Sequence, residues 1–202
     1  FDYLLLMDSD GEDRPVDVKK LIEKINEAPN LSVVAKRFKR SEGLLFQLLY
    51  QFHKLITIFF TGKNINFGNF SVLTRKDVGS LHSKASLWSS FSGSVKKHIT
   101  ELNEINSIRG IRYFGPSKMS LIKLIVHSFS MIAVFKYQVF LRSALMIIAL
   151  NFVSSYFESL TIFLQILIVI FNLMIFLVSK RELEKDLVNS QNNLSDIKII
   201  TR

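Results

Sequence analysis

The sequence predicts an α/β domain that is followed by an amphipathic helix and a pair of membrane-spanning helices. Short apolar runs and helical patterns alternate along the first part of the chain, which is typical of an α/β fold. Further on, two stretches are long and apolar enough to cross a bilayer. We therefore divide the 202 residues into an α/β domain (1–117), an amphipathic helix (118–136), a transmembrane hairpin (137–179, with spans 137–157 and 159–179) and a polar tail (180–202).

The first element is the apolar run Tyr3–Met7, which we interpret as a buried strand. Acidic residues follow at alternate positions, Asp8, Asp10 and Glu12, before Pro15 opens a helix. Side chains two positions apart lie on the same side of an extended chain, so these carboxylates repel one another unless a cation lies between them. Because hard oxygen ligands suit Mg²⁺ or Mn²⁺, we expect Asp8 and Asp10 to bind such a metal, with Glu12 as a third ligand. The alternative is an acidic turn that caps the next helix.

The next elements continue the α/β order. Apolar positions predict a helix over 16–28 and a second strand over 31–35. This order favours a largely parallel sheet, in which ligands bind beyond the carboxyl ends of the strands, where the acidic residues lie. The second strand ends in the basic run 36–40, which includes Arg37. We expect these cations at the same edge, beside a metal–diphosphate site, and a solvated basic loop is the alternative.

The middle of the chain is less regular. Residues 42–60 predict an apolar-rich helix that carries several polar side chains, so it is either packed in the protein or lies along a membrane surface. Residues 68–75 predict a loop that leads into a strand, and 76–97 a mixed helical region. The single tryptophan, Trp88, is interpreted as a core or interface anchor. Residues 105–111 predict a weak strand.

The last third predicts membrane attachment. Ser117 is placed to cap a helix that runs to about Phe135, whose apolar stripe suits either a bilayer interface or the domain core. The first span contains one charge, Arg142, close enough to an end to reach the interface, and a tight turn at Glu158 separates it from the second. Basic residues flank both outer ends, so the positive-inside bias places the α/β domain and the C-terminus in the cytoplasm. A buried hairpin of a soluble protein is the alternative.

Charge and composition narrow the classes of partner. The net charge is +9, and residues 30–142 hold seventeen basic and four acidic residues. Such an excess predicts an anionic partner: nucleic acid, a phosphorylated substrate or an acidic membrane. The sequence has no RNA-binding motif, helix-turn-helix pattern or zinc-ligand spacing, so we do not expect a nucleic acid. The absence of cysteine excludes disulfides and thiolate chemistry.

Several motifs occur in an order that resembles a known family. They are Asp8-Ser9-Asp10 after a strand, Pro15, Lys36-Arg37 after the next strand, Gly68-Asn69-Phe70 leading to Arg75, and Arg112-Tyr113-Phe114-Gly115-Pro116-Ser117-Lys118 before the amphipathic helix. The first looks like the Asp-x-Asp signature of GT-A glycosyltransferases. The last is similar to a motif of the polyprenol-phosphate sugar transferases (dolichyl-phosphate mannose synthase-like) of glycosyltransferase family 2. The resemblance covers roughly residues 1–135, and a two-helix C-terminal anchor also occurs in several members.

The resemblance implies that residues 1–117 are the C-terminal part of a GT-A domain. It implies a nucleoside-diphosphate sugar as donor and a polyprenyl phosphate, such as undecaprenyl or dolichyl phosphate, as acceptor. The family's nucleotide-base pocket lies before the position of Asp8, and the chain begins without Met inside a strand. We therefore expect a fragment that lacks its N-terminal nucleotide-binding part and is inactive by itself.

The resemblance also assigns roles to residues. Asp8 and Asp10 match the metal and diphosphate positions, and Glu12 stands where the family usually has a glutamine ligand. Arg37 matches a basic residue after the second strand. The remaining matches are to the motif that contacts phosphate groups in the active site: Arg112, Ser117 and Lys118. Of all these residues, Asp8, Asp10, Arg112 and Lys118 are the expected catalytic ones.

Asn69 departs from the family, since many relatives have aspartate there. An amide is no general base, but a phosphate acceptor needs none, because a phosphomonoester is already an anion near neutral pH. The substitution therefore favours a phosphate acceptor over a hydroxyl acceptor, with Asn69 as a substrate-binding residue.

Two other functions remain open. Residues 109–113 faintly resemble the acceptor motif of processive polysaccharide synthases, although that motif's tryptophan is missing here and such enzymes need more membrane spans. The other alternative is an inactive relative that serves as a membrane scaffold. The retained Asp8 and Asp10 argue against it, because an inactive protein has no need to keep two repelling carboxylates together.

Overall fold

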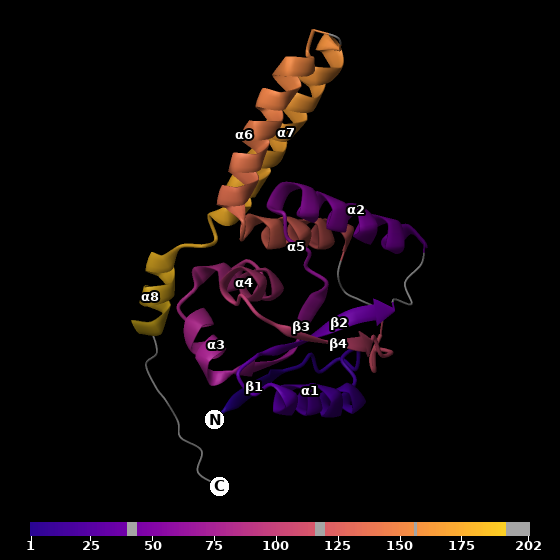
Figure 1. The fold of residues 1–202 in the computed structure, drawn as a ribbon, viewed down its shortest axis with the longest axis vertical. Coiled ribbons are helices and arrows are strands. Elements are labelled where there is room, and N and C mark those ends of the chain that lie inside the picture. Colours follow the sequence, from indigo (N-terminus) through magenta and orange to yellow (C-terminus); the bar gives the residue numbers. More distant parts are fainter. Residues whose placement is uncertain (40–43, 116–119, 156, 193–202) are drawn as a thin grey trace.

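The computed structural model has a mixed α/β domain from which a helical hairpin projects (Figure 1). It describes residues 1–39, 44–115, 120–155 and 157–192, apart from the side chains of 37–39, 44–47 and 191–192. The sheet has four strands, β1 (Tyr3–Leu6), β2 (Val33–Lys39), β3 (Phe67–Thr74) and β4 (Asn103–Ile108), in the order β1-β3-β2-β4.

The sheet is mixed, so the prediction of a largely parallel sheet is wrong. Strands β2 and β4 pair in parallel, but β3 runs antiparallel to both β1 and β2. The reason lies in α2 (Leu44–Thr61), which packs against α5 (Leu121–Ala133) and α6 (Lys136–Val153) instead of crossing the sheet as a connecting helix. The chain therefore re-enters the sheet in the opposite direction. As a result, the carboxyl ends of β1, β2 and β4 meet the beginning of β3 at one edge.

Strand β1 is exposed, contrary to the prediction of a buried strand. Its residues Tyr3, Leu4 and Leu5 keep 38%, 39% and 42% of their surface accessible. A continuous apolar run is typical of a strand that is buried on both faces, whereas alternation of apolar and polar residues is typical of a half-buried strand. In the structure, β1 is an outermost strand of the sheet and pairs only with β3 among the described strands.

Two apolar cores cover the two faces of the sheet. Helix α1 (Pro15–Glu27) packs Leu21 and Ile25 on one face, against alternate residues of β2 and β3. The other face is covered by α3 (Arg75–Leu81), the short 3₁₀ helix η1 (Ala85–Trp88) and α4 (Phe91–His98). Trp88 was predicted to be a core or interface anchor; it is 45% exposed, so it does not lie in the core, and the interface role stays a prediction.

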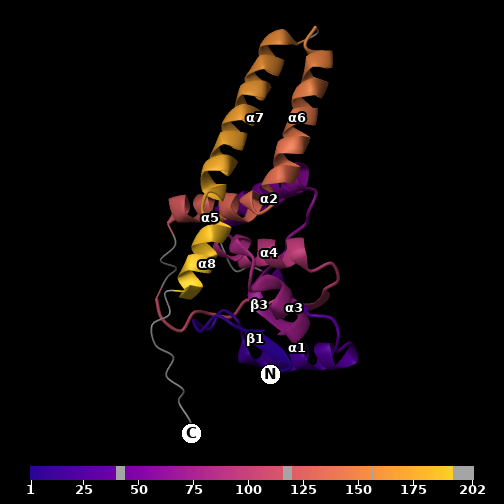
Figure 2. The same cartoon turned by 90° about the vertical axis from the view of Figure 1, so that its left-hand side faces the viewer.

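A third core joins the domain to the hairpin. Helices α2 and α5 lie across the base of α6 and α7 (Glu158–Ser179), and α8 (Glu184–Asn192) follows them (Figures 1 and 2). Phe60 of α2 stacks against Phe171 of α7 with ring centroids 4.2 Å apart, and Phe129 of α5 lies 5.7 Å from the same ring. Helix α5 is capped by Ser120, whose side chain accepts a hydrogen bond from the Lys123 amide. The predicted cap, Ser117, lies outside the described residues.

The two hairpin helices are long and apolar enough to span a membrane. They have 18 and 22 residues, or about 27 and about 33 Å at 1.5 Å per residue, close to the thickness of bilayer hydrocarbon. Only 11% of the residues in each apolar window are buried within the protein. This weighs against the alternative of a buried soluble hairpin, whose helices would be mostly covered.

Candidate functional site

Several of the predicted site residues, Asp8, Asp10, Glu12 and Arg112, lie where the loop after β1 meets the loop after β4. The Gly110 amide donates to the Glu12 carbonyl oxygen at 2.8 Å, and the Tyr113 amide donates to the Asp10 carbonyl oxygen at 2.9 Å. We call residues 8–14 and 109–113 the paired loops. Gly11 has φ +90°, and a Cβ there would lie 2.8 Å from the Tyr113 ring. The fit therefore requires glycine at this position.

Carboxylates of the first loop are bound by arginines of the second. The Glu12 side chain is only 12% exposed, and its two oxygens pair with the guanidinium groups of Arg109 and Arg112. Arg112 Nε lies 2.6 Å from Glu12 Oε1, and an Arg112 Nη atom lies 3.2 Å from Asp10 Oδ2. Arg112 thus bridges two of the carboxylates that were predicted to bind a metal.

These contacts perturb the ionisation of the pair. Burial of the Glu12 carboxyl acts to raise its pKa, but the hydrogen bonds from Arg112 and Arg109 outweigh burial, and the pKa is lowered from its usual value of 4.5. The hydrogen bond to Glu12 raises the pKa of Arg112 above its usual value. Both groups are therefore charged at neutral pH.

Asp8 is held from two further directions. Its Oδ1 accepts a hydrogen bond of 3.3 Å from the Asn69 side-chain amide, and its backbone amide donates to Asp13 Oδ2 at 3.0 Å. Asn69 reaches Asp8 because β3 runs antiparallel and begins at the edge where β1 ends. In this structure the amide of Asn69 orients a carboxylate of the acidic loop, a contact that aspartate could not make while ionised.

The carboxylates of Asp8 and Asp10 are the type of oxygen ligand that a hard metal ion takes. Magnesium is commonly bound through one or two carboxylates, with substrate phosphates and water as its other ligands. Glu12 does not have the geometry of a third ligand here, because both its oxygens are paired with guanidinium groups. Over the described ranges, no cluster of three or more acidic or histidine side chains is arranged to hold a metal.

The other predicted residues are only partly placed. Arg37 lies in β2 opposite Ser107 of β4, so its backbone is near the edge of the sheet where the paired loops lie. Its side chain is not among those that the structure describes. Ser117 and Lys118 lie outside the described residues. Lys36, from the predicted basic run, pairs at 3.7 Å with Glu104 on β4.

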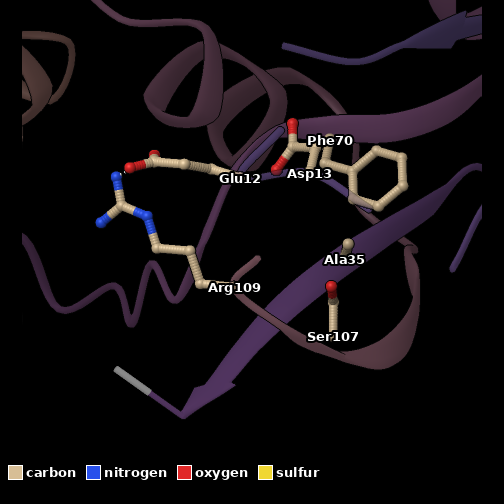
Figure 3. A pocket seen from close by; sticks show the side chains of 6 residues that line it. All are labelled: Glu12, Asp13, Ala35, Phe70, Ser107 and Arg109. Carbon is tan, nitrogen blue, oxygen red and sulfur yellow. Dashed lines mark hydrogen bonds and ion pairs between the residues drawn. The ribbon is translucent and has the colours of Figure 1, made fainter. Parts of the chain in front are cut away.

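A small cavity of about 10 Å³ lies beneath the paired loops, room for about one water molecule (Figure 3). It is lined by Glu12, Asp13, Ala35, Phe70, Ser107 and Arg109. Figure 3 shows the side chains of Glu12 and Arg109 directed toward each other on one side of it. A wider depression of about 410 Å³ lies at the opposite edge of the sheet, between Tyr3, Asn30 and Arg75. That depression is remote from the carboxylates, so we place the site at the paired loops.

Sequence reasoning missed the partnership of Arg109 with Glu12. Ninety-seven positions separate the two residues, so no local pattern connects them. The sequence does show an excess of carboxylates after β1 and of arginines after β4. This pattern predicts a contact only if both strands are already known to end at the same edge of the sheet.

Searches with protein-family models, among curated proteins and among solved structures each returned no match to this chain.

Proposed function

We propose that this chain carries the metal-binding and acceptor-binding residues of a membrane-bound glycosyltransferase that moves a sugar from a nucleoside-diphosphate sugar to a polyprenyl phosphate. The observation that carries the proposal is the contact between Arg112 and Asp10, whose side chains lie 3.2 Å apart. A donor diphosphate needs carboxylates that hold a metal, and an acceptor phosphate needs cations. Here the two kinds of group share one edge of the sheet, on a domain attached to an apolar hairpin.

The proposal includes a GT-A fold for the α/β domain, and the mixed four-stranded sheet is the observation that supports it. It also includes the family 2 resemblance of the motifs from Asp8 to Lys118. The support from the structure is the common location of the first, fourth and fifth motifs, at Asp8, Asn69 and Arg112.

In the proposed mechanism an oxygen of the acceptor phosphate attacks the anomeric carbon of the donor sugar. The new carbon–oxygen bond forms as the bond to the diphosphate breaks, and the nucleoside diphosphate leaves with the electron pair. No proton has to be removed from the nucleophile, which is consistent with an amide at Asn69. A Mg²⁺ or Mn²⁺ ion held by Asp8 and Asp10 would offset charge on the leaving diphosphate.

The remaining residues bind and orient the substrates. Arg112 is proposed to hold a phosphate oxygen, because its planar guanidinium can offer two parallel donors. Ser117 and Lys118 follow in the sequence and are proposed as further phosphate ligands, together with Arg37 of β2. Asn69 keeps Asp8 oriented. The domain and the C-terminus are proposed to be cytoplasmic, with the turn at Glu158 on the opposite side of the membrane.

A scaffold without activity is the second candidate, and one observation favours it. The carboxylates of Asp10 and Glu12 are already neutralised by arginines within the chain. Their retention therefore does not by itself require a metal or a reaction.

The test uses membranes that contain the complete gene product, with polyprenyl phosphate, Mg²⁺ or Mn²⁺ and a panel of labelled nucleotide sugars. We expect label from one donor in a lipid that is extracted by organic solvent and cleaved by mild acid, and its loss on addition of EDTA. The Asp10→Asn protein is expected to lose about 10²-fold or more of this transfer, whereas the control Glu101→Gln, at an exposed acid before β4, retains it. Label only in a polymer would favour a polysaccharide synthase, and no label from any donor would favour the scaffold.

A further inference from the structure

We propose that Glu12 is a positioning residue that holds Arg112 on Asp10, and that a divalent cation arriving at Asp10 releases Arg112 toward the phosphate substrate. The inference rests on the proposed function for the identity of the substrate. It changes the role expected for Glu12 from metal ligand to anchor of the arginines, and it makes Arg112 an occupant of the cation site before substrate binds.

The first step is the geometry of Arg112. Its guanidinium lies between two carboxylates, 2.6 Å from Glu12 and 3.2 Å from Asp10. In the absence of other cations this is where a positive charge relieves the repulsion between the acids. A metal ion that binds Asp10 must compete with that guanidinium, since both are attracted to the same carboxylate.

The second step is the position of Glu12. Both of its oxygens are engaged, and the side chains of Glu12, Arg109 and Arg112 are all shielded from solvent to a large degree. Moving Glu12 onto a metal would break its ion pairs with two largely buried guanidinium groups, which is costly. Asp10 is more exposed than Glu12. Only its Oδ2 atom contacts Arg112, whereas its Oδ1 atom accepts a hydrogen bond from the Glu12 backbone amide. Asp10 is therefore the carboxylate that can be exchanged between the arginine and a metal.

The third step is the backbone. Gly110 packs against the carbonyl oxygen of Gly11 so closely that a Cβ at residue 110 would collide with it. Together with the two backbone hydrogen bonds of the paired loops, this contact helps to fix the separation between Arg112 and Asp10. The register of the two loops, and not the arginine alone, therefore determines whether Arg112 reaches the carboxylate.

The competition has a reciprocal consequence. If Arg112 weakens the binding of a cation at Asp10, then the cation weakens the hold on Arg112 by the same factor. A guanidinium freed from Asp10, but still anchored through Glu12, can present its donors to a phosphate. The arrangement therefore orders binding, with the cation before the acceptor phosphate.

The experiment measures Mn²⁺ binding by the complete protein in detergent, without nucleotide sugar, from the electron paramagnetic resonance signal of free Mn²⁺. Loss of binding in Asp10→Asn identifies the site. We expect Arg112→Gln to bind Mn²⁺ about 5-fold or more tightly than wild type, in the usual range of coupling between two ligands. Glu12→Gln should bind Mn²⁺ at least as tightly as wild type, because Arg112 is then held less firmly on Asp10, whereas loss of a metal ligand weakens binding about 10-fold or more.

Gly110→Ala separates the loop register from charge. Because it spreads the paired loops without removing any charge, it should also tighten Mn²⁺ binding. The matched control is Gly79→Ala in α3, where a Cβ meets nothing within 4 Å and no change is expected.

Each outcome decides the inference. A Glu12→Gln protein that loses Mn²⁺ makes Glu12 a ligand and overturns it, as does an Arg112→Gln protein with unchanged or weaker binding. No Mn²⁺ binding by any of the proteins overturns the inference together with the metal role in the proposed function. The expected Mn²⁺ pattern without any lipid-linked sugar would support the inference while the proposed function fails.

Discussion

The hydroxyl group of Ser107 donates a hydrogen bond of 3.1 Å to the carboxylate of Asp17, and both side chains are buried. Asp17 lies in the first turn of α1 and Ser107 lies in β4, so the contact joins the helix to the last strand of the sheet. Arg14 and Lys20 complete the shell around the carboxylate, at 2.8 and 2.7 Å. The same strand continues into Arg109, so this contact also supports the paired loops.

Replacing Asp17 by alanine is expected to destabilise the domain by about 2–3 kcal/mol, because a buried acceptor is lost and Ser107 and two cations lose their common partner. Ser107→Ala should cost about 1 kcal/mol. Glu23→Gln is the control, since Glu23 is exposed and its pair with Lys19 is 3.8 Å long. Thermal or urea unfolding, followed by circular dichroism, measures the three free energies. Equal stability of Asp17→Ala and Glu23→Gln would contradict the structural role.

Stability is expected to fall in acid. Burial acts to raise the pKa of Asp17, but hydrogen bonds from Lys20, Arg14 and Ser107 outweigh it and lower the pKa below 3.8; the pKa of Glu12 is likewise lowered from 4.5. Groups whose pKa is depressed in the folded state add stability that is fully present above the unfolded value and is lost as pH falls through the folded value. Unfolding free energies measured from pH 7 down to pH 3 should therefore decrease below about pH 4.5. An Asp17→Asn protein should show a shallower decrease, and an identical pH profile would exclude the Asp17 contribution.

Arg142 is expected to fix the end of α2. Its Nη1 atom donates a hydrogen bond of 3.2 Å to the carbonyl oxygen of Phe59, and its guanidinium lies against Gly62, which has φ +70°. Arg142→Leu keeps the apolar stem but removes the donor. Amide hydrogen exchange near the end of α2 should then quicken by roughly 5-fold, as expected for about 1 kcal/mol. Mass spectrometry of peptides from α2 measures this. Lys63→Gln, at an exposed residue after the helix, is the control and should change nothing.

The exposed face of α2 is expected to lie in the membrane interface. Leu48, Phe52, Leu55 and Phe59 are all exposed and recur at helical spacing, beside the base of the apolar hairpin. In a Trp88→Phe background, a tryptophan placed at residue 52 should be quenched strongly by brominated lipids. The wild-type protein is the control, because its single Trp88 lies in η1 on the sheet-covering layer and should be quenched weakly. Equal quenching of the two proteins would place α2 away from the bilayer.

The sequence predicted most elements because their signals are local. The helical spacing of Leu21 and Ile25, the basic flanks of the hairpin and its apolar length can be read within a few turns of chain, and the corresponding helices are present. Asp8 and Asn69 were both predicted to lie in one site, and their side chains are in contact in the structure. Their roles as metal and phosphate ligands remain predictions.

Features that depend on distant segments were not predicted. Strand β3 runs in the reversed direction because α2 packs against α5 and α6 instead of against the sheet. No periodic pattern within α2 or β3 indicates this packing. The exposure of Tyr3 depends on β1 being the edge of the sheet. The pairing of Glu12 with Arg109 and Arg112 depends on the register between two loops, which a linear pattern does not contain.

The joint between α5 and α6 consists of Val134 and Phe135, both fully buried. A buried joint restricts rotation between the domain and the hairpin more than an exposed, flexible linker would. In the proposed orientation, this joint therefore limits how far the distance between the paired loops and the lipid surface can vary. A lipid-linked reactive group would reach the paired loops by lateral diffusion in the membrane. Only a group that extends from the lipid surface by about the distance of the paired loops would come into contact with them.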